Sequence, residues 1–436
     1  MSNHPWHEMN RRAFLHDSGL LAAAAVTAGL TLPSHARASS RRPSGRLKVG
    51  VIGCGGRGTG AAVNILEASE DVEIHAMGDM FADRVKGAVH ELGEIDPKLA
   101  ARAIVPEDRV FTGFDAYKQV LATGVDIAIL ATPPGFRPTH FAAAIEAGAH
   151  VFMEKPVATD PAGVRTVIDA ARKAADRKLS VVSGTQRRHE RCYLDAMRRI
   201  QEDGAIGEVI AAQVYWNQAG LWHKDHEPEW SDMEWQLRNW LYFTWLSGDH
   251  IVEQHVHNLD VAAWALGENP VSCMGMGGRQ SRVKPEYGHI FDHFAIHYEY
   301  AGGRAVHSYC RQQDGTTPRS EEIIIGTKGR AVLASGRAEI FGEHPWKWKG
   351  KQTNPYVQEH IDLMASIKGD GPYLNEGERI AESTLVAIMG RMGAYTGKHV
   401  EWTQAMESKL DLTPPKLELG TIPVPDVAMP GRTPLI

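Results

Sequence analysis

The chain has 436 residues, which is enough for two or three domains with sizeable cores. Hydrophobic residues make up 43% of it and charged residues 23%, a balance typical of soluble globular proteins. The net charge is −6 without a long basic run, which argues against nucleic-acid binding, and the four cysteines are too scattered for a disulfide framework.

The N-terminus predicts export. Arg11 and Arg12 precede Phe14 and Leu15, and a mild apolar run then leads to an A-x-A sequence. This combination is typical of a secretory signal, and the arginine pair resembles a twin-arginine signal. We therefore expect residues 1–38 to be a twin-arginine signal peptide and the mature chain to work in the periplasm. A membrane helix is the alternative, but neither this short run nor any later stretch is apolar enough to span a bilayer.

The first strand and the turn after it predict a nucleotide-binding site. Residues 47–52 have the pattern of a buried strand, residues 61–68 that of a helix, and a GxGxxG motif lies between them. Glycines allow the tight turn and let a pyrophosphate approach the helix N-terminus, and the strand and helix context distinguishes the motif from an unrelated Gly-rich turn. The cofactor-binding candidates in this turn are Gly53, Gly55, Gly56, Arg57 and Gly58.

A second strand places an acid where a dinucleotide needs one. Residues 72–79 form an apolar-rich run that ends at Asp79, 21 residues after Gly58. An acid at this spacing binds the ribose 2′-hydroxyl, which favours NAD over NADP. We therefore expect NAD as the cofactor.

Strands and helices then continue to alternate. Strand patterns at 125–132, 149–156 and 179–186 are separated by helical ones, which predicts a doubly wound parallel sheet in a Rossmann domain spanning 47–186. Ligands bind beyond the carboxyl ends of such strands, so the residues there are expected to line one crevice. These residues are Asp79, Thr132, Pro133, Pro134, Glu154, Lys155 and Gln186. His140, in the helix after the proline turn, is expected to be structural or adjacent to the cofactor.

Beyond residue 186 the pattern becomes that of an antiparallel sheet. Strand-like runs recur from residue 208 to residue 335, with glycine-bearing turns, and two long helical runs follow. Residues 404–436 are Pro-rich and irregular. The predicted fold class is therefore α/β plus α+β, with an N-terminal Rossmann domain and a C-terminal domain that has an open, mostly antiparallel sheet and flanking helices.

Five motifs carry a resemblance to a known family. They are VGVIGCGGRG, ATPPGFRPTH, HVFMEKPVA, GTQRRH and GAIGEV, in this order. The chain resembles the Gfo/Idh/MocA oxidoreductases, which include glucose–fructose oxidoreductase and inositol dehydrogenase, from about Leu47 to about Trp402. The resemblance implies a substrate and oligomerisation domain over 187–403, with dimers or tetramers formed through its open sheet.

The stretch from Gly248 to Leu266 predicts an amphipathic helix with ionisable groups on one face. His255 falls within the apolar arc and is expected to be structural. Glu253 and His257 are four residues apart, so their side chains should meet. A carboxylate beside an imidazole fixes its tautomer and raises its basicity, which suits the abstraction of a hydroxyl proton.

The family resemblance gives this pair a role. It implies that an acid four residues before a histidine performs this proton transfer with help from the lysine of the Glu-Lys-Pro motif, so Lys155, Glu253 and His257 are the catalytic candidates. Two departures from the family pattern are Glu253 in place of Asp and His255 in place of Gly. The alternatives are a solvated polar face and a metal site at His250, Glu253 and His257. Nothing else in the chain requires a metal, because hydride transfer needs only a base and the cofactor, so we expect none.

Substrate-binding candidates come from this helix and from an aromatic segment. Residues 215–245 hold six of the chain's eleven tryptophans, and sugars pack their C–H faces on such rings, although most of these tryptophans are expected to lie in the core. The candidates are Arg188, Trp222, His223, Lys224, Asp249, His250 and His257.

These features predict an exported NAD-dependent oxidoreductase that acts on a sugar, glycoside or polyol. Because free NAD is scarce outside the cytoplasm, we expect the cofactor to stay bound and to be recycled, so that the net reaction is redox-neutral. One alternative is a glycosidase or epimerase that works by transient sugar oxidation. Another is a sugar-binding protein that has lost catalysis.

Overall fold

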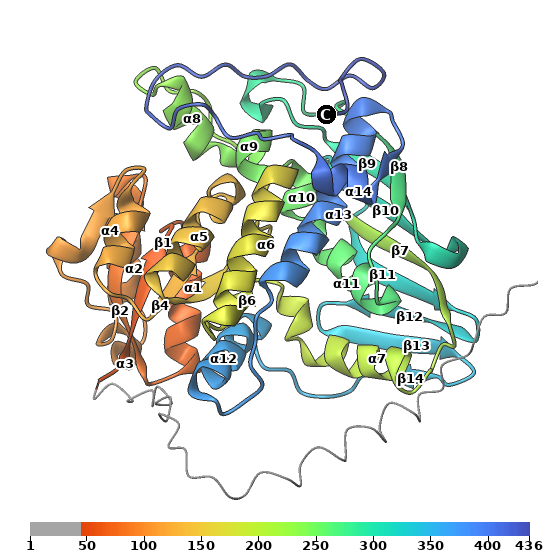
Figure 1. The fold of residues 1–436 in the computed structure, drawn as a ribbon, viewed down its shortest axis with the longest axis horizontal. Coiled ribbons are helices and arrows are strands. Elements are labelled where there is room, and N and C mark those ends of the chain that lie inside the picture. Colours follow the sequence, from red (N-terminus) through yellow and green to blue (C-terminus); the bar gives the residue numbers. More distant parts are fainter. Residues whose placement is uncertain (1–44) are drawn as a thin grey trace, which may run out of the picture. The chain divides into compact units, whose positions relative to one another are not determined.

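The protein is described by a computed structural model that covers residues 45–436 (Figure 1). The predicted signal peptide, residues 1–38, lies outside the described residues. Residues 45–436 form one compact unit around two sheets, one parallel and one mostly antiparallel, which confirms the predicted fold class. No helix in this part of the chain is long and apolar enough to cross a membrane.

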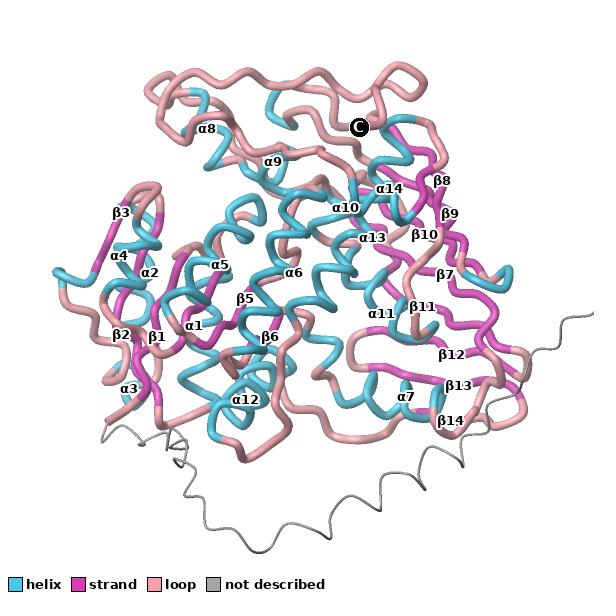
Figure 2. The backbone as a smooth tube through the Cα atoms, in the orientation of Figure 1, coloured by secondary structure: helices cyan, strands magenta, loops and turns pink. Residues whose placement is uncertain are grey.

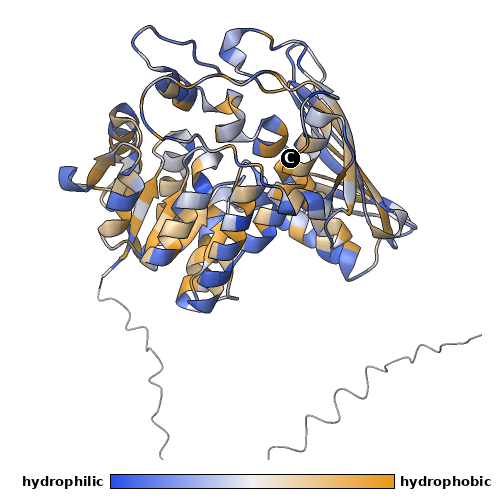
Figure 3. Cartoon of the chain, turned by 45° about the horizontal axis from the view of Figure 1, so that its top comes forward, coloured by the Kyte–Doolittle hydropathy of each residue, from blue (hydrophilic) through white to orange (hydrophobic). Residues whose placement is uncertain are grey.

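The first sheet has six parallel strands in the order β3-β2-β1-β4-β5-β6, the order of a Rossmann fold. Its strands are β1 (Leu47–Ile52), β2 (Val72–Asp79), β3 (Val110–Thr112), β4 (Ile127–Leu130), β5 (His150–Met153) and β6 (Val181–Ser183). The helices between them are α1 (Gly56–Ala68), α2 (Ala82–Gly93), α3 (Pro97–Ala100), α4 (Ala116–Ala122), α5 (Arg137–Ala147) and α6 (Pro161–Asp176). Every residue of β4 is buried because helices cover both faces of the sheet, and its strands are accordingly mostly hydrophobic in Figure 3.

The second sheet has nine strands in the order β14-β13-β12-β11-β7-β10-β9-β8-β15, and only the β7–β10 pair is parallel (Figure 2). Its strands are β7 (Val209–Gln218), β8 (Ser272–Gly278), β9 (His293–Glu299), β10 (Ala305–Gln312), β11 (Arg319–Gly326), β12 (Gly329–Ala334), β13 (Arg337–Gly342), β14 (Trp346–Lys347) and β15 (Val400–Glu401). Burial alternates along β9 and β10, as it does in strands with one covered face.

Helices of the second half pack on both sheets. They are α7 (Arg191–Gln201), α8 (Asp232–Arg238), α9 (Thr244–Ser247), α10 (His250–Glu253), α11 (Val256–Leu266), α12 (Pro355–Lys368), α13 (Gly377–Thr396) and α14 (Trp402–Glu407). Leu363 and Met364 of α12 belong to the same apolar core as β1 and β2. Helix α13 lies between α6 and β8. The second half of the chain therefore helps to build the core of the Rossmann domain.

The stretch expected to form one helix from Gly248 to Leu266 is divided into α10 and α11. The N–H of His255 donates to the carbonyl of His250, five residues back, and the N–H of His257 donates to the carbonyl of Gln254, three residues back. These bonds interrupt the regular four-residue ladder, so Glu253 and His257 lie on different helices.

Candidate active site

Two pockets meet at the carboxyl ends of the parallel strands. The larger has a volume of about 550 Å³ and the smaller about 290 Å³. They share four lining residues, which are Arg57, Ala131, Thr132 and Trp240. The pockets therefore form one continuous crevice, at the edge where a doubly wound sheet binds its ligand.

The glycine turn forms one wall of the larger pocket. Gly53 has φ +95°, and a Cβ there would lie 2.4 Å from the amide nitrogen of Thr132. A Cβ on Gly58 would lie 1.8 Å from the carbonyl oxygen of Gly53, whereas Gly55 and Gly56 face open space. Helix α1 also begins without a side-chain cap. This cradle has the free backbone N–H groups and the room that a pyrophosphate requires.

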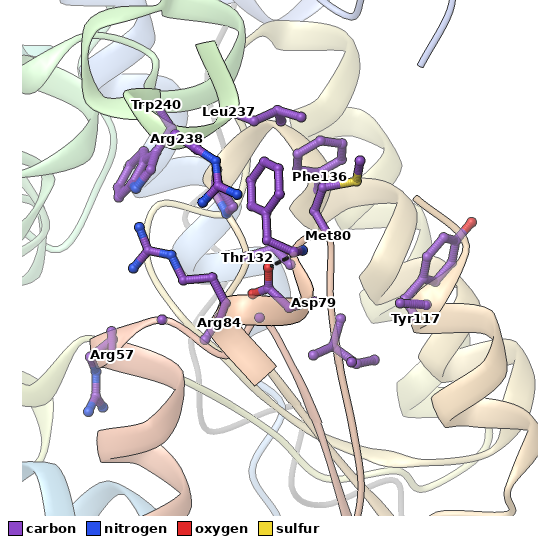
Figure 4. A pocket seen from close by; sticks show the side chains of 18 of the residues that line it. Arg57, Asp79, Met80, Arg84, Tyr117, Thr132, Phe136, Leu237, Arg238 and Trp240 are labelled. Carbon is purple, nitrogen blue, oxygen red and sulfur yellow. Dashed lines mark hydrogen bonds between the residues drawn. The ribbon is translucent and has the colours of Figure 1, made fainter. Parts of the chain in front are cut away.

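Asp79 lies at the end of β2 in the larger pocket (Figure 4). Its carboxylate accepts hydrogen bonds from the backbone N–H groups of Cys54, at 2.7 Å, and Phe81, at 3.0 Å. Burial raises the pKa of Asp79, whereas these two hydrogen bonds lower it. Apolar and aromatic side chains line the pocket beside it, namely Met80, Phe81, Phe114, Tyr117 and Phe136. An adenosine fits this combination of an acid for the ribose and aromatic rings for the base.

Thr132 lines both pockets, and it contacts His140 of helix α5. The Thr132 hydroxyl lies 3.1 Å from Nδ1 of His140, whose ring stacks on Tyr117 with a centroid distance of 4.2 Å. Burial first, and then the charge of Arg137, lower the pKa of His140 to about 3, so its ring is neutral. Pro133 lines the larger pocket and Pro134 the smaller one, in the turn that enters α5.

Lys155 is held firmly in the smaller pocket. Its ammonium donates to the Glu253 carboxylate at 2.9 Å and to the Glu253 backbone carbonyl at 2.6 Å. Both side chains are largely buried, at 13% and 12% exposure, so this ion pair is poorly screened by solvent. A fixed ammonium group thus faces the pocket from the end of β5.

His257 lines the same pocket from the first turn of α11. Its ring stacks on Trp216 with a centroid distance of 5.7 Å, and its Nδ1 is enclosed without a hydrogen-bond partner among residues 45–436. Burial, and then the charges of Lys155 and Arg187, lower the pKa of His257 well below its usual value. The imidazole is therefore neutral at physiological pH, with one unprotonated ring nitrogen, but it is a weaker base than the expected pairing with Glu253 would make it.

The expected contact between Glu253 and His257 is replaced by another. Within the described chain, no hydrogen bond joins these two side chains, and Glu253 binds Lys155 instead. The break between α10 and α11 changes the spacing that the helical pattern implied, and the nearby ammonium attracts the carboxylate more strongly than a neutral imidazole can.

The smaller pocket is also lined by Arg57, Glu154 and Tyr356, of which Arg57 contacts the other two. Nε of Arg57 donates to the Glu154 carboxylate at 2.5 Å, and the Arg57 guanidinium lies 4.9 Å from the ring centre of Tyr356. Gln186 lines this pocket too, and its buried Oε1 has no protein partner in residues 45–436. An unpaired amide oxygen here could accept a hydrogen bond from a ligand amide or hydroxyl.

Several predicted substrate residues bind internal partners instead. Asp249 is fully buried and accepts hydrogen bonds from the backbone of Phe291 at 2.8 Å and from the hydroxyl of Tyr395 at 2.5 Å. His250 lies beside Asp249, with 2.9 Å between Nδ1 and the carboxylate.

Two further predicted substrate residues also lie outside the pockets. Arg188 forms a bidentate pair with Asp260, at 2.8 and 3.0 Å, above the ring of Trp264. His223 packs edge-on against Tyr287. Arg188, His223, Asp249 and His250 line neither pocket. Arg188, Asp249 and His250 bind partners inside the fold, whereas His223 is exposed.

Two substrate candidates from the aromatic segment, Trp222 and Lys224, line the larger pocket and not the smaller pocket that contains Lys155. The crevice is also lined by residues that were not candidates from the sequence. Trp240 and Tyr356 also line the crevice and come from segments with no motif of their own, whereas Arg137 lies within the ATPPGFRPTH motif but was not a candidate. Only the concentration of tryptophans around residue 240 pointed to this region.

The metal alternative finds no support in residues 45–436. No group of three or more His, Cys, Asp or Glu side chains there could hold a metal ion. His250 faces Asp249, whereas Glu253 faces Lys155, so the three ligands of that alternative do not converge.

Comparisons with known proteins agree with this geometry. A model of an oxidoreductase family with an NAD-binding Rossmann fold matches residues 47–183, and the GFO/IDH/MocA C-terminal domain matches residues 194–332. A glycosyl hydrolase family 109 protein of a Shewanella species is 25% identical over 406 residues, covering 83% of this chain and 84% of that protein. An alpha-N-acetylgalactosaminidase of Shewanella oneidensis is 26% identical over 408 residues, with the same coverage of both chains.

Solved structures share the fold. Aldose-aldose oxidoreductase from Caulobacter crescentus, crystallised with glycerol, has a TM-score of 0.65 at 16% identity and covers 82% of this chain and 99% of its own. The gentamicin-biosynthesis protein GenD2, crystallised with NAD, has a TM-score of 0.62 at 18% identity, with 82% and 96% coverage.

Proposed function

Because the chain belongs to the Gfo/Idh/MocA oxidoreductase family and has its NAD-binding Rossmann domain, we propose that it transfers hydride between a sugar, glycoside or polyol hydroxyl carbon and NAD held in the crevice. One observation carries this proposal. A fixed ammonium, Lys155, and a neutral imidazole, His257, line the same pocket of about 290 Å³, next to the glycine cradle.

The two side chains have complementary roles in this proposal. His257 accepts the proton of the reacting hydroxyl, and the Lys155 ammonium donates a hydrogen bond to the oxygen as it becomes an alkoxide and then a carbonyl. Bound NAD supplies the hydride acceptor. Glu253 fixes the position of Lys155, and the low pKa of His257 favours return of the proton when the carbonyl is reduced again.

Bound NAD would be recycled in each turnover. The signal-like sequence at residues 1–38 supports export by the twin-arginine route, which carries folded proteins and would bring the cofactor along. A periplasmic enzyme with no NAD supply must then reoxidise its own NADH. The net reaction is therefore redox-neutral, with one sugar oxidised and another reduced.

A second candidate, a glycosidase, is supported by the relatives named glycosyl hydrolase family 109 protein and alpha-N-acetylgalactosaminidase. Oxidation of a ring hydroxyl to a ketone acidifies the neighbouring C–H. A base takes that proton, and the aglycone leaves with the electron pair of its bond and takes up a proton. Water then adds across the resulting double bond, which restores the C–H, and the ketone is reduced by the same hydride. The net change is hydrolysis, and NAD is regenerated.

Association into homo-oligomers is also part of the proposal. The open face of the second sheet exposes apolar side chains, including Met274 at 57% and Met276 at 75% on β8, which a second copy could cover. Light scattering on the purified protein tests this directly. A monomer at high concentration would contradict it.

The reaction is tested with the protein purified from its natural compartment. Denaturation should release close to one NAD per chain, and the intact protein should either interconvert a sugar pair or release nitrophenol from nitrophenyl N-acetyl-α-galactosaminide. His257→Ala should abolish turnover and keep the bound NAD. A wild-type protein that binds a sugar tightly but turns over none of these substrates would be a binding protein, and the proposal would be wrong.

A further inference from the structure

The larger pocket has a roof that no Rossmann motif predicts. The roof comes from residues 221–245, here called the cap, which lie between β7 and α10 and include α8 and the first two residues of α9. Five cap residues line the pocket, namely Trp222, Lys224, Leu237, Arg238 and Trp240. In Figure 4, the side chains of Leu237, Arg238 and Trp240 lie on the opposite side of the pocket from Asp79 and Thr132.

A separate apolar core joins the cap to the cofactor loops. It is formed mainly by cap side chains, among them Trp235, Tyr242 and Phe243. Side chains from three loops of the Rossmann domain pack against it, namely Met80 and Phe81 after β2, Phe114 after β3 and Phe136 after β4. The backbone of Trp245 also approaches Gly135 so closely that a Cβ there would lie 2.0 Å from the Trp245 carbonyl oxygen. The cap is therefore anchored on the loops that border the adenosine end of the crevice.

Arg238 fastens the rim of the cap to the Rossmann domain. Its guanidinium donates to both carboxylate oxygens of Asp83, each at 3.1 Å, and to Glu234 at 2.9 Å. It also lies 3.8 Å from the ring centre of Phe81. One side chain thus combines a bidentate ion pair with a cation–π contact at the mouth of the pocket.

The C-terminal tail, residues 408–436, holds the cap from the outside. In Figure 1 it runs along α8, and the N–H of Met233 donates to the Gly420 carbonyl at 3.0 Å. The Gln236 side chain donates to the Ile422 carbonyl at 3.3 Å, and Leu412 and Ile422 pack on the core of the cap. Because the tail binds both the backbone and a side chain of α8, it restricts movement of the helix that carries Arg238.

We propose that the cap and the C-terminal tail form a cofactor-retaining subsite, in which Arg238 closes the cap over the adenosine half of NAD and the tail keeps it closed. This inference rests on the proposed function, because it explains how an exported enzyme keeps its nicotinamide through repeated turnovers. Rossmann residues such as Asp79 recognise the nucleotide, whereas the cap and tail set the rate at which it leaves.

The test measures cofactor exchange and not turnover. The holoprotein is mixed with excess deuterium-labelled NAD, and the label in the bound fraction is followed by mass spectrometry. Arg238→Met should speed exchange by about 10-fold, the size expected for the loss of an ion pair and a ring contact together. Arg319→Met is the matched control, because Arg319 also pairs with a carboxylate, Glu321, and lies 3.7 Å from the ring centre of Tyr215, but lines neither pocket. It should leave exchange unchanged.

Removal of residues 409–436 should speed exchange at least as much as Arg238→Met. If that protein does not fold, Ile422→Ala with Leu412→Ala weakens the same contacts in a full-length chain, and thermal unfolding confirms the fold. Exchange as slow as wild type in Arg238→Met and in the tail variants would overturn the subsite. A wild-type protein purified without NAD would instead contradict the proposed function, so the two failures are distinguishable.

Discussion

The two pockets of the crevice hold their ligand-facing groups in different ways. In the larger pocket, the fit to a ligand is set by the backbone and by shape. Gly53 and Gly58 leave no room for a side chain, and aromatic rings line the pocket beside Asp79. The smaller pocket depends on charge, since Lys155 is positioned by Glu253 and lies beside a neutral His257. A nucleotide that stays bound needs a close-fitting cradle, whereas a reacting hydroxyl needs groups that exchange protons and charge.

The largest expected effect is on the smaller pocket alone. Lys155→Met should lower kcat by about 10²–10³-fold, because it removes the donor that stabilises the developing oxygen charge. Bound NAD, measured after denaturation, should stay at the wild-type level. Lys173→Met, which removes an exposed lysine paired with Glu146, is the control and should change neither quantity. Loss of NAD together with activity would mean that the two pockets are not separable in this way.

The next largest effect belongs to the larger pocket. Gly58→Ala places a Cβ 1.8 Å from the Gly53 carbonyl oxygen, so the turn must shift, at a cost of about 1–3 kcal/mol in unfolding free energy. NAD content should fall with it, as chemical denaturation and cofactor release can measure. Gly87→Ala in α2 is the control, because a Cβ there meets no atom within 4 Å. Full NAD occupancy in Gly58→Ala would contradict the role of the cradle.

A smaller effect on kcat is expected at Glu253, and it distinguishes an action through Lys155 from an action on His257. Glu253→Gln keeps the size of the side chain but removes its charge, and we expect kcat to fall by about 10-fold. If Glu253 acts through Lys155, the substitution should have almost no further effect in a Lys155→Met background. An equal drop in both backgrounds would instead favour a separate action on His257.

The last prediction concerns the stability of the fold at His189, a residue that lines neither pocket. His189 lies 2.6 Å from Asp362 of α12 and 3.7 Å from Glu376. Burial opposes its charge, but the hydrogen bond to Asp362 and the negative charge of Glu376 prevail and raise the pKa of His189 to about 10. Because the folded pKa lies above the unfolded value of about 6.5, this stabilisation is complete below pH ~6.5 and is lost as the pH rises through about 10.

Denaturant unfolding of His189→Gln measures this contribution. At pH 6 the variant should be less stable than wild type by about 1–3 kcal/mol, and the difference should shrink toward pH 10. A difference that is independent of pH would assign His189 a packing role only.

The larger pocket could be predicted from the sequence better than the smaller one, because it depends on local motifs and the smaller one depends on contacts between distant segments. The glycine turn, Asp79 and the alternation of strands and helices follow from local backbone and side-chain patterns, which short stretches of sequence record. The pairing of Lys155 with Glu253 depends on where two segments 98 residues apart meet, and the break after Glu253 was not visible in a helical wheel. Asp249 is polar in sequence but internal in the fold, because its partners Phe291 and Tyr395 come from distant elements.

The cap and tail were the least predictable parts. Arg238 has no motif, and its partners Asp83 and Phe81 lie in the other domain. The tail is irregular in sequence, and its position is seen only in the fold, from its contacts with α8, with Asp160 and with Thr396. Segments of this kind gain their order from the surfaces that they cover, so composition alone does not reveal it.

The most direct test of the account is a single-turnover experiment with enzyme in excess over a sugar or glycoside substrate. The absorbance of reduced nicotinamide is followed in the holoprotein without added NAD. We predict that it rises and then decays as product forms in the wild type, and that in Lys155→Met with the same NAD content it rises about 10²–10³-fold more slowly. Product formation in a fully NAD-loaded wild-type protein without any reduced nicotinamide, at rates that would reveal it, would contradict hydride transfer at this site.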